Sequence, residues 1–482
     1  MNGRRRKFVR HAAAGVCLSF ALCLALLIFT GCKPAHAPQV QPQELTFYFT
    51  CDIHGRLSPC GCFTGQYGGM TRLKSILDTQ GNTNDMRLDI GDAIGGAEDF
   101  HVLEYRQILK AFALMKYDAI NLGRREARLP AATLVDLVRS SPVPVLCANL
   151  RDKTTGKPIA EPWRIIKRGT CRIAIVGAMD TKGLADELGE GLAAEDIETS
   201  LARILPNVRP QADLVVLLAF ADEETLTKLA RQFYELDLIL GGRVRQPAQQ
   251  VQKENRALID FTTNESRALG LLKVRWSRQS PMEPLLHDII LLRDTIPEDQ
   301  TIMALSSDYR RLVRQTKIWL DDPERLRQDQ VPGVRASASY VGTDECLSCH
   351  PSAAKVWQKS AHSRAFTTLK KKEADADPKC IPCHTVGFGI ISGYQRSFNG
   401  SKLANVGCES CHGPGSLHVR QQQGDSSISF KFRPLGSADC QKCHYGEFSR
   451  PFSWENFWPP ISHGAEGTGK SAPSKLSAAH QN

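Results

Sequence analysis

Four short motifs repeat two cysteines and a histidine at one spacing, Cys-x-x-Cys-His. Two thiols one helical turn apart can add to the two vinyl groups of a haem, and the next imidazole then reaches the iron. Four such copies in an exported chain predict four covalently bound haems c and leave zinc pairs or a disulfide scaffold as weak alternatives. The thiols are Cys346, Cys349, Cys380, Cys383, Cys408, Cys411, Cys440 and Cys443, and the histidines are His350, His384, His412 and His444.

The second axial ligand of each haem must be something other than methionine from this half of the chain. The last methionine of the sequence is Met303, ahead of every motif. Methionine opposite histidine raises a haem potential, so its absence predicts mostly low potentials. We expect aromatic side chains to pack on the porphyrins: Trp357, Phe366, Phe388, Trp454 and Trp458.

A different constellation lies near the start of the chain. Asp52 and His54 follow an apolar run, and Asp92 follows a second one. Carboxylates and imidazole in such loops are metal ligands. Cys60 and Cys62 come shortly afterwards, close to Cys51, and could form a redox dithiol, a soft-metal site or a plain disulfide. Cys147 and Cys171 end two predicted neighbouring strands, which leaves a disulfide between them open.

The elements that must position these residues differ between the two halves. From residue 45 to about 295, short apolar runs alternate with amphipathic stretches, which predicts a layered α/β domain with its site at the strand ends. Strands are expected at 45–50, 86–90, 119–123, 143–150, 171–177, 213–220 and 237–242, and helices at 72–79, 103–115 and 223–233. Residues 300–335 are charged and predicted helical, and apolar runs become rare from Tyr340 onward.

The first half resembles the 5′-nucleotidase-like metallophosphoesterases. Asp52-Ile53-His54, the following GQYGGMTRLKSIL and Gly91-Asp92 match the family's first metal loops. The resemblance implies a sheet sandwich with two metals that activate water against a phosphate ester. The later loops depart from the pattern: Arg124 and Arg125 stand where the family has Asn-His, Phe220 where it has a histidine, and Arg243 and Arg245 where it has two more.

Arginine stays protonated and does not bind metal, so Asp52, His54 and Asp92 are predicted to be vestigial and no intact dinuclear centre is expected. We expect Arg124, Arg125, Arg243 and Arg245 to converge beside the two aspartates. There they either replace the metals by pairing with the carboxylates, which we favour, or bind an anion.

The second half resembles the tetrahaem cytochrome c family that includes the electron acceptor of hydroxylamine oxidoreductase in nitrifying bacteria. The matching segments are YVGTDECLSCHPSAAKVWQKSAHSRAFTTL, DPKCIPCHTVGFG, NVGCESCHGPGSLH and CQKCH with WENFWPPISH. The resemblance implies stacked haems with histidine on most distal faces, and by position His362, His418 and His463 would be those ligands. Three candidates for four haems leave one iron without a distal imidazole, unless His480 near the C-terminus or a histidine of the other half supplies it.

The N-terminus predicts export. A basic cluster, an apolar run over 16–29 and Thr-Gly-Cys32 resemble a bacterial lipoprotein signal in which Cys32 is lipidated; an uncleaved membrane anchor is the alternative. Once that cluster is removed, the net charge of +10 falls and is spread along the chain, which argues against nucleic acid as a partner. The body would face the periplasmic side of a bacterial membrane, inner or outer.

The predicted order is a lipoprotein signal peptide over 1–31, a tether over 32–44, a metallophosphoesterase-like α/β sandwich over 45–298 and a helical connector over 299–338. A mainly α, haem-cored multihaem domain follows over 339–465, then a disordered tail over 466–482. The chain is predicted to pass electrons to other redox proteins rather than to hydrolyse esters. The alternatives are a redox enzyme acting on a small nitrogen or sulfur species at an open haem or at the Cys60–Cys62 thiols, and a surviving nucleotidase.

Overall fold

The computed structural model describes residues 42–59, 66–263, 265–316, 338–396, 402–446 and 449–464. Cys32, Cys60, Cys62 and His480 lie outside these residues, as do the predicted signal peptide, most of the tether and the whole predicted tail. No described helix is long and apolar enough to cross a membrane.

Two six-stranded sheets form the first half. One sheet has the order β14 (Glu283–Leu291), β13 (Ala268–Trp276), β1 (Gln43–Thr50), β2 (Met86–Asp89), β3 (Ala119–Asn121) and β4 (Val145–Leu146). The other has the order β11 (Gln252–Glu254), β12 (Ala257–Phe261), β10 (Leu238–Gly242), β9 (Leu214–Phe220), β7 (Cys171–Met179) and β6 (Trp163–Arg168). A short pair, β5 (Leu150–Asp152) and β8 (Leu192–Ala194), completes the strands of the described part.

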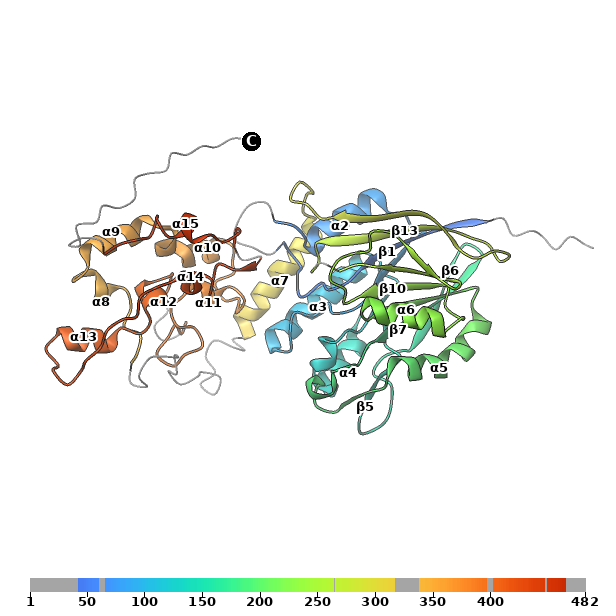
Figure 1. Cartoon of the computed structure of the whole chain (residues 1–482), viewed down its shortest axis with the longest axis horizontal. Helices are drawn as coiled ribbons and strands as arrows, with labels where there is room; N and C mark the ends of the chain where they lie inside the picture. Colours follow the sequence, from blue (N-terminus) through green and yellow to red (C-terminus); the bar gives the residue numbers. More distant parts are fainter. Residues whose placement is uncertain are drawn as a thin grey trace, which may run out of the picture.

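Helices cover the outer faces of both sheets, so the predicted layered sandwich is confirmed (Figure 1). The first sheet carries α2 (Met70–Gln80), α3 (Asp99–Leu114) and α4 (Ala131–Ser140), whose buried residues share one large core with the strands. The second sheet packs against α5 (Ile197–Val208) and α6 (Glu223–Gln232) in a separate cluster. Every strand and helix predicted for this half is present; β6, β8, β11 to β14, α4 and α5 were not among those predicted.

Helix α7 (Gln300–Thr316) is more than a connector. Its Ile302, Tyr309 and Val313 are buried in the core of the first half, because they lie on one face of the helix. Figure 1 shows α7 and α3 between the sheets and the second half of the chain. The remainder of the predicted connector lies outside the described residues.

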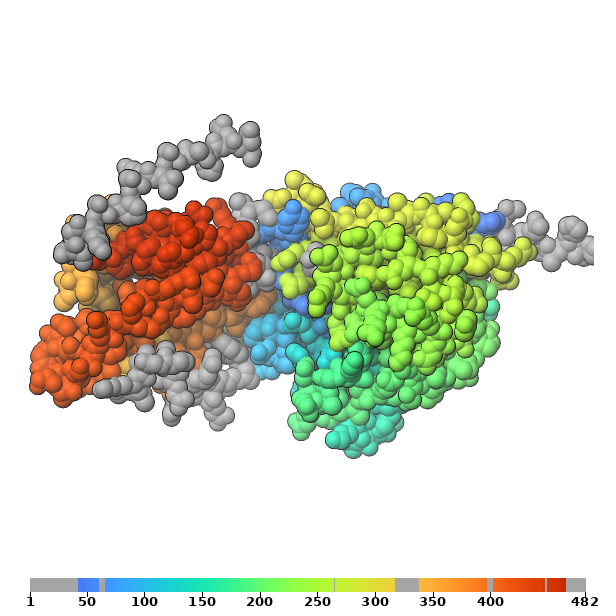
Figure 2. Space-filling view, viewed as in Figure 1, coloured from blue at the N-terminus to red at the C-terminus, as the bar shows by residue number. Residues whose placement is uncertain are grey.

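The second half consists of short helices: α8 (Asp344–Leu347), α9 (Pro351–Lys359), α10 (Ala365–Lys371), α11 (Ile381–His384), α12 (Cys408–His412), α13 (Ser416–Gln422), α14 (Ser437–Cys440) and α15 (Trp454–Phe457). Figure 2 shows this half as a lobe beside the sandwich. Its apolar core is one small cluster around Phe366, Ile381 and Tyr394. Helices this short bury too little apolar surface to hold one another, which fits a domain organised around large prosthetic groups.

Candidate haem sites and a vestigial metal cluster

All four cysteine–histidine motifs lie on a helical turn. His350 N donates to Cys346 O at 3.0 Å and His444 N donates to Cys440 O at 2.9 Å, which are hydrogen bonds of one α-helical turn. The second and third motifs lie within α11 and α12. All eight motif thiols are free of disulfides. Each pair of thiols is therefore arranged as attachment to one haem requires.

Three of the motif histidines face a second imidazole. Ring centroids are separated by 6.2 Å for His350 and His418, 6.0 Å for His444 and His362, and 5.9 Å for His412 and His463. Two imidazole nitrogens that bind one metal ion from opposite sides, at about 2 Å each, place their rings roughly 6 Å apart. Each pair thus leaves room for one iron.

Burial prepares these rings for metal binding. Desolvation lowers the pKa of His362 and of His444, and it also lowers the pKa of His412 and of His418. The neutral imidazole is the form that donates an electron pair to iron.

A cavity beside the third motif has the lining that a porphyrin needs. It is lined by Cys408, Cys411, His412 and His463. Trp357 and Trp458 are also in the wall, where two of the predicted packing aromatics were expected. The residues present therefore fit a covalently bound haem at this motif.

His384 of the second motif is held by a different contact. Its Nδ1 lies 2.8 Å from Ala365 O, a bond that orients the ring and leaves Nε2 for a metal. Within the described residues, all three predicted distal histidines lie beside other motifs. The sixth ligand of a second haem must therefore come from another part of the chain or from a small molecule.

The motifs are also close to one another. Cys408 raises the pKa of the Cys346 thiol, and Cys443 lowers the pKa of the Cys383 thiol, so the thiols of each pair lie close enough to interact. The first motif is thus beside the third, and the second beside the fourth. Haems attached there would be neighbours, as electron transfer requires.

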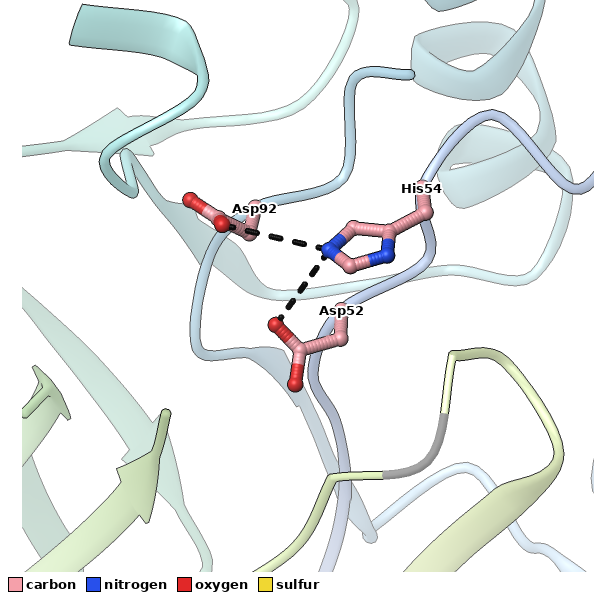
Figure 3. A group of neighbouring side chains, drawn as sticks. All are labelled: Asp52, His54 and Asp92. Carbon is pink, nitrogen blue, oxygen red and sulfur yellow. Dashed lines mark ion pairs between the residues drawn. The ribbon is translucent and has the colours of Figure 1, made fainter. Parts of the chain in front are cut away.

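The metal-ligand residues of the first half meet where β1 and β2 end. These strands are parallel neighbours, so Asp52 and Asp92 follow them at one edge of the sheet. His54 Nε2 lies 3.6 Å from Asp52 Oδ1 and 3.9 Å from Asp92 Oδ2 (Figure 3). One oxygen or nitrogen from each of the three residues lies within 4.8 Å of the others, so the group can hold one metal ion.

The backbone of this cluster is strained and buried. Asp52, His54 and Asp92 have φ values of 54°, 49° and 59°, a region that non-glycine residues rarely adopt outside functional sites. Burial raises the pKa of Asp52. Glu126 accepts hydrogen bonds from the backbone N–H groups of Asp92, Ile94 and Gly123, which fixes the second loop.

The arginines do not converge as predicted. Arg125 Nε lies 3.7 Å from Asp92 Oδ2, so this residue does pair with a ligand carboxylate. Arg243, with φ of 61°, instead pairs with Asp180 at 2.6 Å and Asp222 at 2.8 Å. Arg124 donates to Lys182 O, and Arg245 is exposed. The reason is local. Asp180 and Asp222 follow β7 and β9, so these strands bring two carboxylates to the Arg243 loop. The sequence did not identify either aspartate as a partner of Arg243.

The Arg243 guanidinium thus lies between the loops that follow β7 and β9 of the second sheet. Since Phe220 is buried at the end of β9, the loops that carry the second metal in the resembling family present no ligand from that position. Thr263 Oγ1 donates to Asp52 Oδ2 at 2.7 Å and occupies one of its lone pairs. Among the described residues, Asp52, His54 and Asp92 form the one group of three ligands close enough to hold a cation.

The proposed disulfide between Cys147 and Cys171 is wrong. Both thiols are free and buried. Ala148 N donates to Gly177 O, six residues along β7 from Cys171, which separates the two positions by roughly 20 Å at the rise of a strand. Burial raises the pKa of Cys147 to about 11 and of Cys171 to about 12, so both are unreactive structural thiols.

Comparison with known proteins assigns the two halves to different classes. Residues 345–413 match the family described as cytochrome c554 and c-prime. Cytochrome c-554 of Nitrosomonas europaea is 39% identical over 97 residues, which are 17% of this chain and 41% of that protein. The 5′-nucleotidase of Bos taurus is 25% identical over 312 residues, 57% of this chain and 54% of that protein.

Solved structures match the fold of the first half. The NAD nucleotidase of Haemophilus influenzae superposes with a TM-score of 0.50 at 17% identity, covering 63% of this chain and 64% of that one. The chain spans about half the length of the curated relatives it matches. It therefore joins a 5′-nucleotidase-like metallophosphoesterase region to a cytochrome c554 domain.

Proposed function

We propose that this protein is an extracytoplasmic multihaem c-type cytochrome that transfers electrons through four covalently bound haems. The observation that carries the proposal is the set of three imidazole pairs, each joining a motif histidine to a histidine from elsewhere in the same half. When bound, the haems supply one-electron chemistry through their iron. Other redox proteins are the proposed partners.

The residues of the chain have distinct tasks in this function. Each pair of thiols attaches one porphyrin, and the motif histidine binds its iron. His362, His418 and His463 are the proposed second ligands, and the loops that carry them hold the imidazoles in place. Trp357 Nε1 donates to Val406 O at 2.8 Å, which fixes an aromatic wall of the cavity at the third motif and limits access of water.

An alternative function is a redox enzyme that acts on a small nitrogen or sulfur species at the second haem. The observation that favours it is the use of all three candidate distal histidines by other motifs. An exchangeable sixth position at Cys380–His384 would admit a small molecule. The Cys60–Cys62 thiols remain a second possible site.

We propose that the phosphoesterase-like region has lost ester hydrolysis. Hydrolysis in this class needs two metals that clamp both the attacking and the leaving oxygen. Here Asp52, His54 and Asp92 suffice for one ion, and Arg243 lies where further ligands would be needed. The region instead binds a partner or tunes the haem domain. A lipid anchor at Cys32, on the periplasmic side, would hold the protein at the membrane.

Haem counting and a redox titration test the proposal. The pyridine haemochrome of the purified full chain should give four haems per chain, with mostly low midpoint potentials because no methionine ligand is available. Fewer than four haems, or uniformly high midpoints, would contradict it. Addition of a small nitrogen oxide or sulfur compound should not produce catalytic turnover if the protein is a carrier; rapid turnover would favour the enzyme.

A further inference from the structure

The second haem motif is in direct contact with the phosphoesterase-like region. Lys379, the residue before Cys380, forms an ion pair with Glu104 of α3. The Lys379 ammonium also lies 5.2 Å from the centre of the Tyr309 ring on α7. The side chain that leads into this motif is therefore held by two helices of the other half.

The contact extends over the surrounding chain. Tyr309 Oη lies 3.3 Å from Asp377 Oδ1, which also accepts from Lys379 N at 3.0 Å. Arg314 pairs with Asp375 at 2.6 Å and Arg310 donates to Lys372 O at 3.0 Å. The second motif is thus positioned against α7 by a set of directional bonds rather than by a flexible linker.

Glu104 is an unusual partner for a lysine. Its side chain is 3% exposed, and its Oε2 is buried with no hydrogen-bond partner among the described residues. Burying the Glu104 carboxylate costs desolvation that its attraction to the partly exposed Lys379 ammonium barely repays, so such a pair is weak evidence for stability. Its position suggests another use, since one partner adjoins a haem attachment site.

Glu104 also touches the loop of the metal cluster. A Cβ atom added to Gly55 would collide with Glu104 Oε2, so the carboxylate packs directly on the residue after His54. Gly55 N donates to Ala93 O at 2.9 Å, which ties the same loop to the residue after Asp92. Glu104 therefore lies between the vestigial metal cluster and the second haem motif.

We propose that the Glu104–Lys379 pair is the electrostatic link by which the phosphoesterase-like region sets the reduction potential of the second haem. The inference rests on the proposed function, because it requires a haem at Cys380 and Cys383. In a buried setting of low dielectric, a nearby positive charge favours the reduced iron and a nearby negative charge favours the oxidised iron. While both residues are charged, their effects on the reduction potential nearly cancel. Lys379 alone should therefore raise the potential, and Glu104 alone should lower it.

The test is a spectroelectrochemical titration of the wild-type holoprotein and of four variants. Lys379→Met leaves the Glu104 charge and should shift the midpoint of the second haem to lower potential. Glu104→Gln leaves the Lys379 charge and should shift it to higher potential. The Glu104→Gln/Lys379→Met double variant should return close to the wild-type value, and Lys379→Arg, which keeps the charge, should do the same.

The second haem is followed by its high-spin ferric signal, so the other three serve as internal references. Arg311→Met, in an exposed ion pair on the same helix α7, is the matched control and should move none of the four midpoints. Opposite shifts confined to the high-spin haem support the link. Shifts of the same sign in both single variants, or no shift, would overturn it, since a structural defect has no reason to change sign with charge.

Failure of the proposed function would give a different result. A wild-type protein with fewer than four haems contradicts the haem assignment before any variant is compared, and one without a high-spin component contradicts the exchangeable position at the second haem. A wild-type protein with that component whose midpoint ignores the Glu104 and Lys379 charges contradicts the link alone. A variant that fails to fold is recognised by loss of haem, and the sign of the shift in the other single variant then decides the question.

Discussion

The two halves of this chain treat metal-binding residues in opposite ways. In the cytochrome half, three histidines from outside the motifs each lie about 6 Å, ring to ring, from a motif histidine. In the phosphoesterase-like half, three ligands remain together while arginines neutralise neighbouring carboxylates. The paired imidazoles support the proposed haem centres, whereas the partial set of metal ligands beside arginines supports the proposed loss of ester hydrolysis.

Loss of a haem is the largest effect that this comparison predicts. Cys408→Ala/Cys411→Ala removes both attachment points of the third haem, so the haem count should fall from four to three. The cavity lined by these thiols would lose its occupant, and the domain should also melt at lower temperature. Haemochrome analysis per chain measures the count.

Cys171→Ala is the control for that experiment. Its thiol is equally free but lies in the phosphoesterase-like half, so the count should stay at four. An unchanged count in the Cys408→Ala/Cys411→Ala protein would mean that the motif is not a haem site.

Removal of one distal imidazole sharpens the haem side of the comparison. His463→Gly should convert the third haem from low-spin to high-spin, raising the high-spin share of the iron from about a quarter to about half. Electron paramagnetic resonance of the oxidised protein measures the share. His287→Asn, in the other half, should leave it unchanged; an identical spectrum for His463→Gly would show that His412 has a different partner.

The phosphoesterase side predicts an absence of turnover. The purified protein with added divalent cations should hydrolyse neither phosphomonoesters nor nucleotides, because one cation cannot replace the two-metal clamp. Arg125→His or Arg243→His alone should not restore activity, since several ligand positions changed together. Strong metal-dependent hydrolysis that disappears in Asp92→Ala would reverse this view of the site.

A smaller effect concerns pH. Burial raises the pKa of Asp260 to about 7, so the folded state binds a proton that the unfolded state releases near pH 4. Stability from this group is therefore present at low pH and is lost as pH rises through 7. Burial lowers the pKa of His287, 3.3 Å away, which acts in the opposite direction below pH 6.5.

Asp260→Asn isolates the carboxyl contribution. The unfolding free energy of this variant minus that of the wild type should be about 2 kcal/mol larger at pH 8 than at pH 5. Urea unfolding of both proteins at the two pH values measures the difference. The same difference at both pH values would mean that Asp260 is ionised throughout.

Local motifs could be predicted from the sequence, and long-range partners could not. The thiol and imidazole spacing of each haem motif is complete within five residues, and Asp52, His54 and Asp92 follow apolar runs that form parallel strands. By contrast, Arg243 pairs with Asp180, which is 63 residues away in the sequence, and Glu104 pairs with Lys379, which is 275 residues away. Such pairs depend on how the sheets and helices pack, and the periodicity of a single sequence does not predict that packing.

The same limit explains why the sequence did not predict the packing of α7 or exclude the disulfide. The stretch after residue 300 reads as a charged helix, but its few apolar side chains are enough to bury α7 against the first half. Cys147 and Cys171 belong to strands that do approach each other, yet the register separates the two thiols. A pattern of residue types predicts the element, while register and packing come from the whole fold.

The spin state of the oxidised full-length holoprotein tests the central claim most directly. Three imidazole pairs for four haems predict an electron paramagnetic resonance spectrum in which about a quarter of the iron is high-spin ferric and the remainder is low-spin. A spectrum in which all four haems are low-spin would mean that the second haem has a strong sixth ligand from the chain. That result would contradict the proposal of an exchangeable position at the second haem, while leaving the three imidazole pairs in place.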